Sequence, residues 1–206
     1  MFADRGPRLV NLAYFGHMWE LYALWTWLPT FLVVSRTTTT GLPPPGGSGI
    51  DAFLAIGVAG LAGCLLGGWA ADRVGRAATA AAALAISGAC CLLSPLFFTA
   101  SRPWLLAFTV VWGAAVIADS GVFSTLLSEL ADRRYLGTAL TTQAAIGFLL
   151  TIVTIQAIPL IAAATGWRYA FLALAAGPMT ALPALAALAA LNRQMMPSTF
   201  TERTSP

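Results

Sequence analysis

Six long apolar stretches constrain this chain more than any other feature of its sequence. Each is long enough to cross the hydrocarbon core of a bilayer as a helix, which takes about 20 predominantly apolar residues. Only 9% of the 206 residues are charged, whereas a soluble globular domain carries about 25%. So few charges could not cover a surface that faces water. The stretches predict membrane spans at residues 9–34, 50–71, 77–99, 104–130, 137–163 and 167–191.

The residue types in these stretches favour helices over strands. Ala, Leu and Gly dominate them, and the short alternating segments of a membrane β-barrel are not visible. We therefore expect an all-α integral membrane protein, a six-transmembrane-helix bundle over residues 9–191. Residues 1–8 are interpreted as a cytoplasmic N-terminal segment and 192–206 as a polar cytoplasmic tail. Between the first two spans, Ser35–Gly49 (SRTTTTGLPPPGGSG) is expected to be a loop.

The distribution of arginine predicts the orientation, because short cytoplasmic loops carry an excess of basic residues. The chain has no lysine, so arginine supplies its whole positive charge. If the N-terminus is cytoplasmic, the inner segments hold eight of the arginines: Arg5, Arg8, Arg73, Arg76, Arg133, Arg134, Arg193 and Arg203. The outer segments then hold only Arg36, Arg102 and Arg168. We expect a multi-pass protein of the cell inner (plasma) membrane with both termini in the cytoplasm.

Several classes of function lack support in the sequence. The net charge of +3 is spread over short loops and is not the footprint of a nucleic-acid partner. Cys64, Cys90 and Cys91 lie in apolar runs and are interpreted as small buried thiols, without metal-ligand spacing. No Gly-rich phosphate loop or redox motif is present. The sequence thus predicts no cofactor, no metal and no enzymatic activity.

The few polar side chains inside the spans are the candidate functional residues, because ionisable groups in a bilayer usually face a cavity or a partner. His17 and Glu20 lie three apart in the first span, so they share a helix face and can interact. Histidine titrates near neutrality, so the two could relay a proton or bind a cation or an amine. Asp119 lies in the fourth span and Gln143 in the fifth. The third and sixth spans hold no ionisable side chain in their interiors and are expected to face lipid.

Each of these residues also has a purely structural interpretation. His17 and Glu20 could be a hydrogen-bonded pair that fixes helix packing. Gln143 and Gln156, both in the fifth span, could hold helices together. The second span contains a small-xxx-small pair, Gly63 and Gly67, which lets two backbones approach closely.

One hypothesis for the function is an intramembrane hydrolase. It is based on the motif Gly46-Gly47-Ser48-Gly49, with His17, the only histidine in the sequence, as the base. Ser48 and Asp51 also match a capping box that would open the second helix, and no other feature supports hydrolysis.

The loop after the second span carries a recognisable signature. Its sequence, from Gly68 to Arg76, is GWAADRVGR. It resembles the G-x-x-x-D-R-x-G-R/K-R/K loop of the major facilitator superfamily at Gly68, Asp72, Arg73, Gly75 and Arg76. Gly68 would let helices pack, Gly75 would allow the tight turn, and Asp72 could face the positive end of a neighbouring helix. The last basic position of the motif is Ala77 here, which is a departure from the pattern.

Other segments are similar to a bacterial subgroup of these carriers, some of which are labelled nitrate/nitrite or cyanate-type transporters. They are GHMWELY from Gly16 in the first span, GTALTTQ from Gly137 at the start of the fifth, and GWR from Gly166 at the start of the sixth. The resemblance covers residues 8–193 and implies the C-terminal six-helix half of a twelve-span carrier. In that family the seventh, eighth, tenth and eleventh helices border the substrate cavity, and the ninth and twelfth do not.

The resemblance implies a secondary transporter, a symporter or antiporter that moves a small solute by alternating access. One bundle is not expected to transport alone, so a second six-helix half is predicted as partner, on another polypeptide or as a homodimer. His17, Glu20, Asp119 and Gln143 would lie on the substrate or proton pathway, and the signature loop would govern the conformational switch. The alternative is a truncated, non-transporting membrane protein or a regulatory remnant of such a carrier. The substrate, the coupling ion and the direction of transport stay open.

Overall fold

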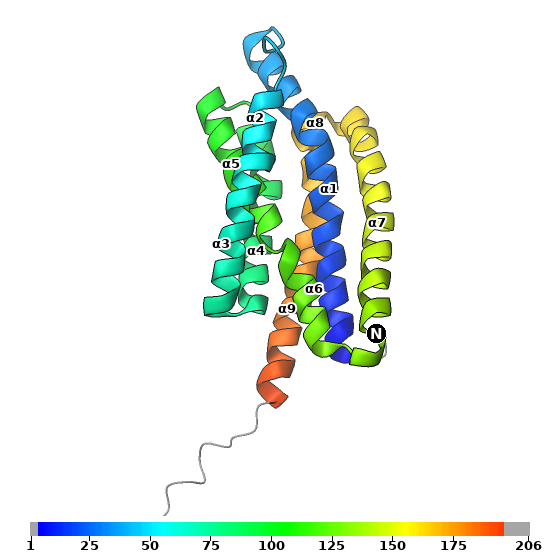
Figure 1. Cartoon of the computed structure of the whole chain (residues 1–206). Helices are drawn as coiled ribbons and strands as arrows, with labels where there is room; N and C mark the ends of the chain where they lie inside the picture. Colours follow the sequence, from blue (N-terminus) through cyan, green and yellow to red (C-terminus); the bar gives the residue numbers. More distant parts are fainter. Residues whose placement is uncertain (1–3, 196–206) are drawn as a thin grey trace, which may run out of the picture.

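The computed structural model describes residues 4–195, and every regular element in that range is a helix. The helices run up and down in one bundle, with the start of the chain, the α3–α4 turn, the α6–α7 loop and the end of α9 at the same end (Figure 1). The α-helices are α1 (Arg5–Thr40), α2 (Gly49–Phe53), α3 (Ala59–Val74), α4 (Arg76–Phe97), α5 (Arg102–Ala118), α6 (Ser120–Leu130), α7 (Leu136–Thr165), α8 (Trp167–Ala170) and α9 (Ala176–Met195). A π-helix at Leu54–Val58 joins α2 to α3, and 3₁₀ turns occur at Arg133–Tyr135 and Phe171–Ala175.

Five continuous helical segments in this range are long and apolar enough to cross a membrane. They are Gly49–Val74, Arg76–Phe97, Arg102–Leu130, Arg133–Thr165 and Trp167–Leu191. These segments match five of the six expected spans within a few residues at each end. The remaining expected span, at residues 9–34, lies in α1, which is 36 residues long but is not among the five. The fold is thus all-helical and of the membrane-embedded type, with five spans by length and composition.

The first helix is longer than the sequence pattern predicts. Residues 35–40 were expected to be loop, but α1 continues through them to Thr40 and ends where Gly41 adopts a φ of 76°. Four consecutive threonines, Thr37 to Thr40, each donate a side-chain hydrogen bond to a carbonyl one turn earlier. These bonds satisfy the threonine hydroxyls within the helix, and the prediction of a loop from residue 35 was wrong as far as Thr40. The helices also begin at Arg5 and continue to Met195, and the rest of the expected tail lies outside the described residues.

Glycines bring α3 against α5 at backbone contact. A Cβ atom placed on Gly63 or Gly67 would lie about 2 Å from the carbonyl oxygen of Ala114 or Ala118, closer than any side chain tolerates. The expected small-xxx-small interface is confirmed at these two positions. Gly68, by contrast, is exposed and has open space where a Cβ would be, so the expectation that it packs helices is wrong within the described chain.

Two of the prolines inside the helices each leave a carbonyl oxygen without its usual helical donor, and a side chain binds that oxygen. Pro159 cannot donate to the carbonyl of Ile155, and the indole Nε1 of Trp27 donates to that oxygen at 2.8 Å. Pro95 frees the carbonyl of Cys91 in the same way, and Ser94 Oγ donates to it at 2.8 Å. These side-chain donors replace the missing proline N–H groups. Backbone carbonyls that lie away from water need such hydrogen bonds.

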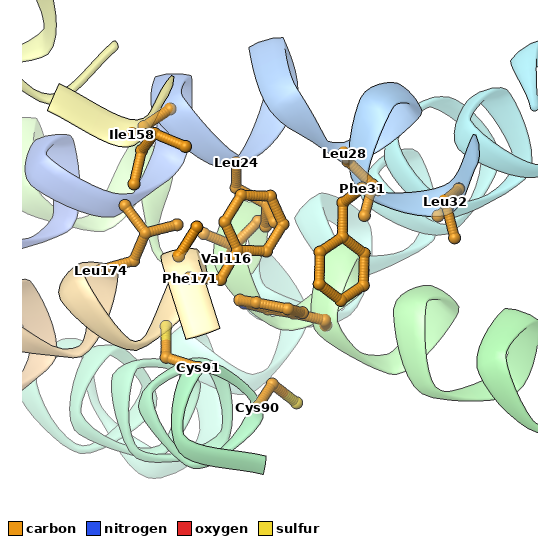
Figure 2. Close-up of a cluster of buried hydrophobic side chains, with 14 of the residues drawn as sticks. Leu24, Leu28, Phe31, Leu32, Cys90, Cys91, Val116, Ile158, Phe171 and Leu174 are labelled. Atoms are coloured by element: carbon orange, nitrogen blue, oxygen red, sulfur yellow. The ribbon is translucent and has the colours of Figure 1, made fainter. Parts of the chain in front are cut away.

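Aromatic and aliphatic side chains from α1, α4, α5, α7 and the 171–175 turn form a buried core cluster (Figure 2). Phe31 stacks on Phe171 with 4.7 Å between ring centroids. Leu24, Leu28 and Leu174 belong to the same cluster and are buried.

The distribution of burial differs from the expectation for the third and sixth spans. Both were expected to face lipid, yet half of the most apolar stretch in Trp167–Leu191 and 44% of that in Arg76–Phe97 are buried, against 22% in Arg133–Thr165. In the sixth span the reason is the close approach of α9 to α1, where Gly16 and Gly177 meet at backbone contact. Small residues on an apolar helix favour tight packing as readily as lipid exposure, so hydropathy alone could not separate the two.

Candidate functional site

The expected polar residues occupy the middle of the bundle, sealed from solvent. His17 lies 12 residues after the start of α1, about 18 Å along its axis. His17, Glu20 and Asp119 have exposed fractions of 2%, 0% and 1%. Because isolated charges at such depth are costly, the partners of each group decide what it can do.

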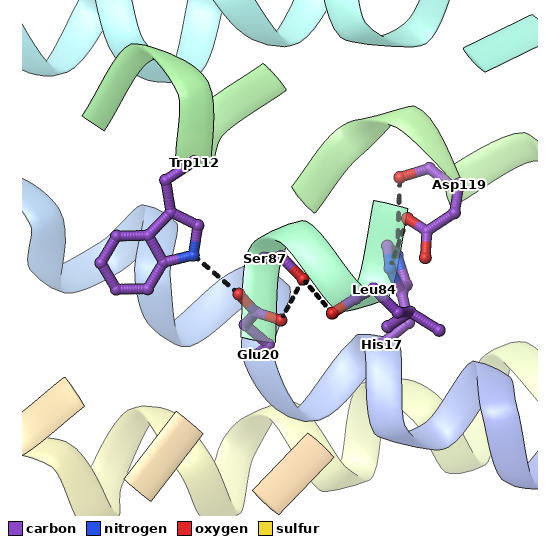
Figure 3. Close-up of polar contacts among 7 residues, drawn as sticks. His17, Glu20, Leu84, Ser87, Trp112 and Asp119 are labelled. Atoms are coloured by element: carbon purple, nitrogen blue, oxygen red, sulfur yellow. Dashed lines mark hydrogen bonds and ion pairs between the residues drawn. The ribbon is translucent and has the colours of Figure 1, made fainter. Parts of the chain in front are cut away.

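His17 pairs with Asp119 rather than with Glu20. Its Nδ1 atom lies 3.0 Å from Asp119 Oδ1, and its Nε2 lies 3.5 Å from Ser120 Oγ. Apart from this ion-pair contact, no hydrogen-bond donor reaches Asp119 Oδ1 within the described chain. The expected contact between His17 and Glu20 is wrong, since no hydrogen bond or ion pair joins the two among the described residues. Figure 3 shows the two groups turning to different neighbours.

Asp119 owes its position to a break in the fourth expected span. It is the single residue between α5 and α6, with φ −99° and ψ −3°. The break is local, since the Val122 N–H still donates to the Asp119 carbonyl at 2.9 Å, and the Asp119 carboxylate contacts His17 on α1. The ring of Phe123, one turn into α6, lies 5.3 Å from the imidazole and covers it.

Glu20 is held by three hydrogen-bond donors that we call the Glu20 cluster: Ser87 and Cys91 on α4, and Trp112 on α5. Trp112 Nε1 donates to Oε1 at 2.8 Å, and Cys91 Sγ donates to the same oxygen at 3.3 Å. Ser87 Oγ donates to Oε2 at 2.9 Å and also lies 3.3 Å from the carbonyl oxygen of Leu84 (Figure 3). No cationic side chain pairs with Glu20 in the described chain.

The Glu20 cluster was not predicted as a unit. Ser87 and Trp112 were not singled out as site residues, and Cys91 was interpreted only as a buried thiol. Cys90 and Cys91 are buried as expected, whereas Cys64 is exposed on α3, so that part of the prediction is wrong. The available signal was the spacing of Ser87 and Cys91, which lie four residues apart and therefore on one helix face.

Gln143 lies away from these groups and contacts a residue that sequence reasoning missed. Its Nε2 donates to Asn11 Oδ1 at 2.8 Å, and both side chains are buried. The Nδ2 group of Asn11 has no partner in the described chain. The structure does not bring Gln143 into contact with His17, Glu20 or Asp119.

The signature loop forms the turn between α3 and α4. Gly75 has a φ of 96°, a left-handed conformation that glycine allows without strain. Arg76 forms an ion pair with Glu129 on α6, and Arg73 lies over the ring of Trp69. Asp72 is exposed and makes no ion pair or hydrogen bond among residues 4–195, and it lines a groove together with Gly121 in the first turn of α6.

A groove of about 260 Å³ runs beside this turn, between α3 and the α5–α6 segment. Gly68, Asp72 and Arg76 lie on one wall and Gly121 and Thr125 on the other. The groove connects the signature loop to the helix that follows the break at Asp119.

The structure does not support the hydrolase hypothesis, because Ser48 and His17 do not contact each other. Ser48 precedes α2 but makes no side-chain cap, and its hydroxyl has no partner among the described residues. The expected capping box is therefore wrong, and Asp51 binds Arg102 instead, at 2.8 Å. His17 contacts Asp119 and Ser120, not Ser48.

The fold and the buried groups together define an all-helical protein of membrane type with a polar interior. A scan of protein-family models finds no match to this chain, and a search of the curated proteins finds none either. The resemblance to the major facilitator superfamily therefore rests on the sequence motifs alone.

Proposed function

We propose that this chain is one six-helix half of a secondary transporter of the major facilitator type, in which α1 is a membrane span in addition to the five identified by length and composition. The half would move a small solute by alternating access together with a second half, and the movement would be coupled to protons. The observation that carries the proposal is the set of three ionisable side chains, His17, Glu20 and Asp119, sealed at mid-depth in apolar helices. Such groups are costly in a membrane and usually mark an ion or substrate pathway.

The break at Asp119 supports the same proposal. Discontinuous helices that carry an ionisable residue at the break are a recurring feature of transporter sites near the bilayer midplane. The carboxylate and the imidazole at the break offer one place where protonation can alter the packing of two half-helices.

The exposed face of α7 argues for a partner. Gln156 is exposed on α7, where Ile152, Val153 and Leu160 are also exposed. An amide turned toward lipid would lack hydrogen-bond partners, so we propose that this face meets a second half or the solute cavity. The partner would be a separate polypeptide or a second copy of the chain.

A second candidate is a non-transporting membrane protein, a truncated carrier or a regulatory remnant of one. The observation behind it is that residues 4–195 form a single bundle (Figure 1), because alternating access requires two. An upstream reading frame that encodes six further spans would favour the transporter, and a frameshift at that place would favour the remnant.

Co-purification followed by reconstitution tests the proposal. The tagged chain is purified from its native membrane with any companion, placed in liposomes, and tested for uptake of nitrate, nitrite, cyanate and a panel of other small solutes. We expect uptake that collapses with a protonophore and that Glu20→Gln and Asp119→Asn abolish. Uptake that is indifferent to the protonophore and to both substitutions would disprove proton coupling. A chain that carries no solute with or without its companion would favour the second candidate.

A further inference from the structure

The donors around Glu20 differ from the partners of any other buried acid in the described chain. Asp119 faces an imidazole, which can carry a positive charge and balance the carboxylate. Glu20 faces an indole N–H, a hydroxyl and a thiol, and none of these can balance a charge. A carboxylate without a counter-charge is costly away from water, whereas the neutral acid is not.

The same donors argue against a metal ion or an amine at Glu20. A cation needs several oxygen ligands, and an ammonium group needs acceptors for its N–H groups. The Trp112 indole is a donor only, and it occupies Oε1 together with Cys91. A proton is the one cation that this arrangement accommodates without displacing a contact.

The Ser87 hydroxyl can form hydrogen bonds that suit both the ionised and the protonated form of Glu20. The hydroxyl has one proton and two nearby acceptors, Glu20 Oε2 at 2.9 Å and the Leu84 carbonyl at 3.3 Å. When Glu20 is ionised, Ser87 donates to Oε2. When Oε2 carries a proton, that proton is donated to Ser87 Oγ, and the hydroxyl rotates to donate to Leu84 (Figure 3). Every donor keeps an acceptor in both states.

We infer that Glu20 is a reversibly protonated carboxyl group and that Ser87 is its positioning residue, reversing the direction of their shared hydrogen bond with each protonation. The proton comes from water and returns to water, and the serine proton only changes its acceptor. This inference rests on the proposed function for its role in transport, because it names the group that carries the coupled proton. The protonation itself is a property of the bundle and can be measured without transport.

Other titratable groups face Glu20 from the elements packed around it. They are His17 on its own helix, Asp119 at the α5–α6 break, and Cys90 and Cys91 on α4. Neither α7 nor the described side chains of α9 bring an ionisable group to this region. Infrared spectroscopy separates these contributions, since only a protonated carboxylic acid gives a carbonyl stretch at the frequency of a neutral acid.

The test is infrared difference spectroscopy of the purified chain in lipid, with its companion if one co-purifies, across the pH range in which it stays folded. We expect a neutral-acid band that disappears reversibly as the pH rises and that is missing in Glu20→Gln. Ser87→Ala should shift the frequency of this band because the acid loses its acceptor, whereas Ser94→Ala should not. Ser94 is a matched control, a buried hydroxyl on the same helix that donates to the Cys91 carbonyl and not to Glu20.

The Glu20→Gln background adds a test that does not depend on titration. Trp112 donates to Oε1, so the glutamine carbonyl must take this position and its NH₂ group must face Ser87. Ser87 then has to accept, as it does from the neutral acid. We expect Ser87→Ala to destabilise Glu20→Gln in detergent unfolding, while Ser94→Ala has the same effect in both backgrounds.

Three results would overturn the inference: a band that stays at every pH, no band at any pH, or a band that Ser87→Ala leaves unchanged. A band that titrates as expected in a chain that carries no solute would support the inference and reject the proposed function, so the two can fail separately.

Discussion

The glycine contact between α3 and α5 leads to a prediction with a built-in control on the same helix. Gly67 and Gly68 are adjacent, and both are replaced by alanine. A Cβ on Gly67 would lie 2.0 Å from the Ala118 carbonyl oxygen, and real Cβ atoms essentially never approach closer than 3.0 Å. The two helices would therefore have to separate by about 1 Å. A Cβ on Gly68 would meet nothing within 4 Å.

The magnitudes follow from two opposing effects. Replacing glycine by alanine inside a helix stabilises it by about 1 kcal/mol at either position. Overpacking costs about 1–3 kcal/mol, and we take the upper end at Gly67 because the obstacle is backbone and cannot rotate away. We therefore expect Gly68→Ala to raise the free energy of unfolding by about 1 kcal/mol and Gly67→Ala to lower it by about 2 kcal/mol.

Unfolding in mixed micelles of rising SDS fraction, followed by far-ultraviolet circular dichroism, measures both variants against the unchanged chain. Gly63→Ala should behave like Gly67→Ala, since its Cβ would lie 2.1 Å from the Ala114 carbonyl oxygen. If Gly67→Ala and Gly68→Ala were equally stable, the close packing of α3 on α5 would be refuted.

Two further predictions use the same unfolding assay. Asp119→Leu leaves His17 buried without its partner and should cost about 3–5 kcal/mol, whereas replacing both residues by leucine should cost less than that; additive losses would contradict the pairing. Trp27→Phe removes the indole that binds the Ile155 carbonyl and should cost about 1–3 kcal/mol. In a Pro159→Ala background the helix supplies an N–H to that carbonyl, so the loss should shrink, and an undiminished loss would mean that the indole contributes by packing alone.

The sequence by itself determined the helical architecture. A bilayer fixes the length of an apolar helix, and backbone groups in lipid must be satisfied within the helix, so composition and length predicted five helices that the structure has at nearly the expected residues. The turn at Gly75 was also predictable, because the required backbone conformation is one that only glycine adopts readily. The end of α1 was not, since threonine has a low helix propensity and the helix nevertheless continues through four threonines to Gly41.

Only the tertiary structure decided which polar groups meet. Helical spacing placed His17 and Glu20 on one face, but it could not show that a break in another helix would turn Asp119 toward His17. Glu20 meets Ser87 and Trp112 because of how closely α1, α4 and α5 approach, and such distances depend on small residues and on their register across helices. A one-dimensional pattern records which face of a helix carries a group, but the partner of that group depends on the packing of the whole bundle.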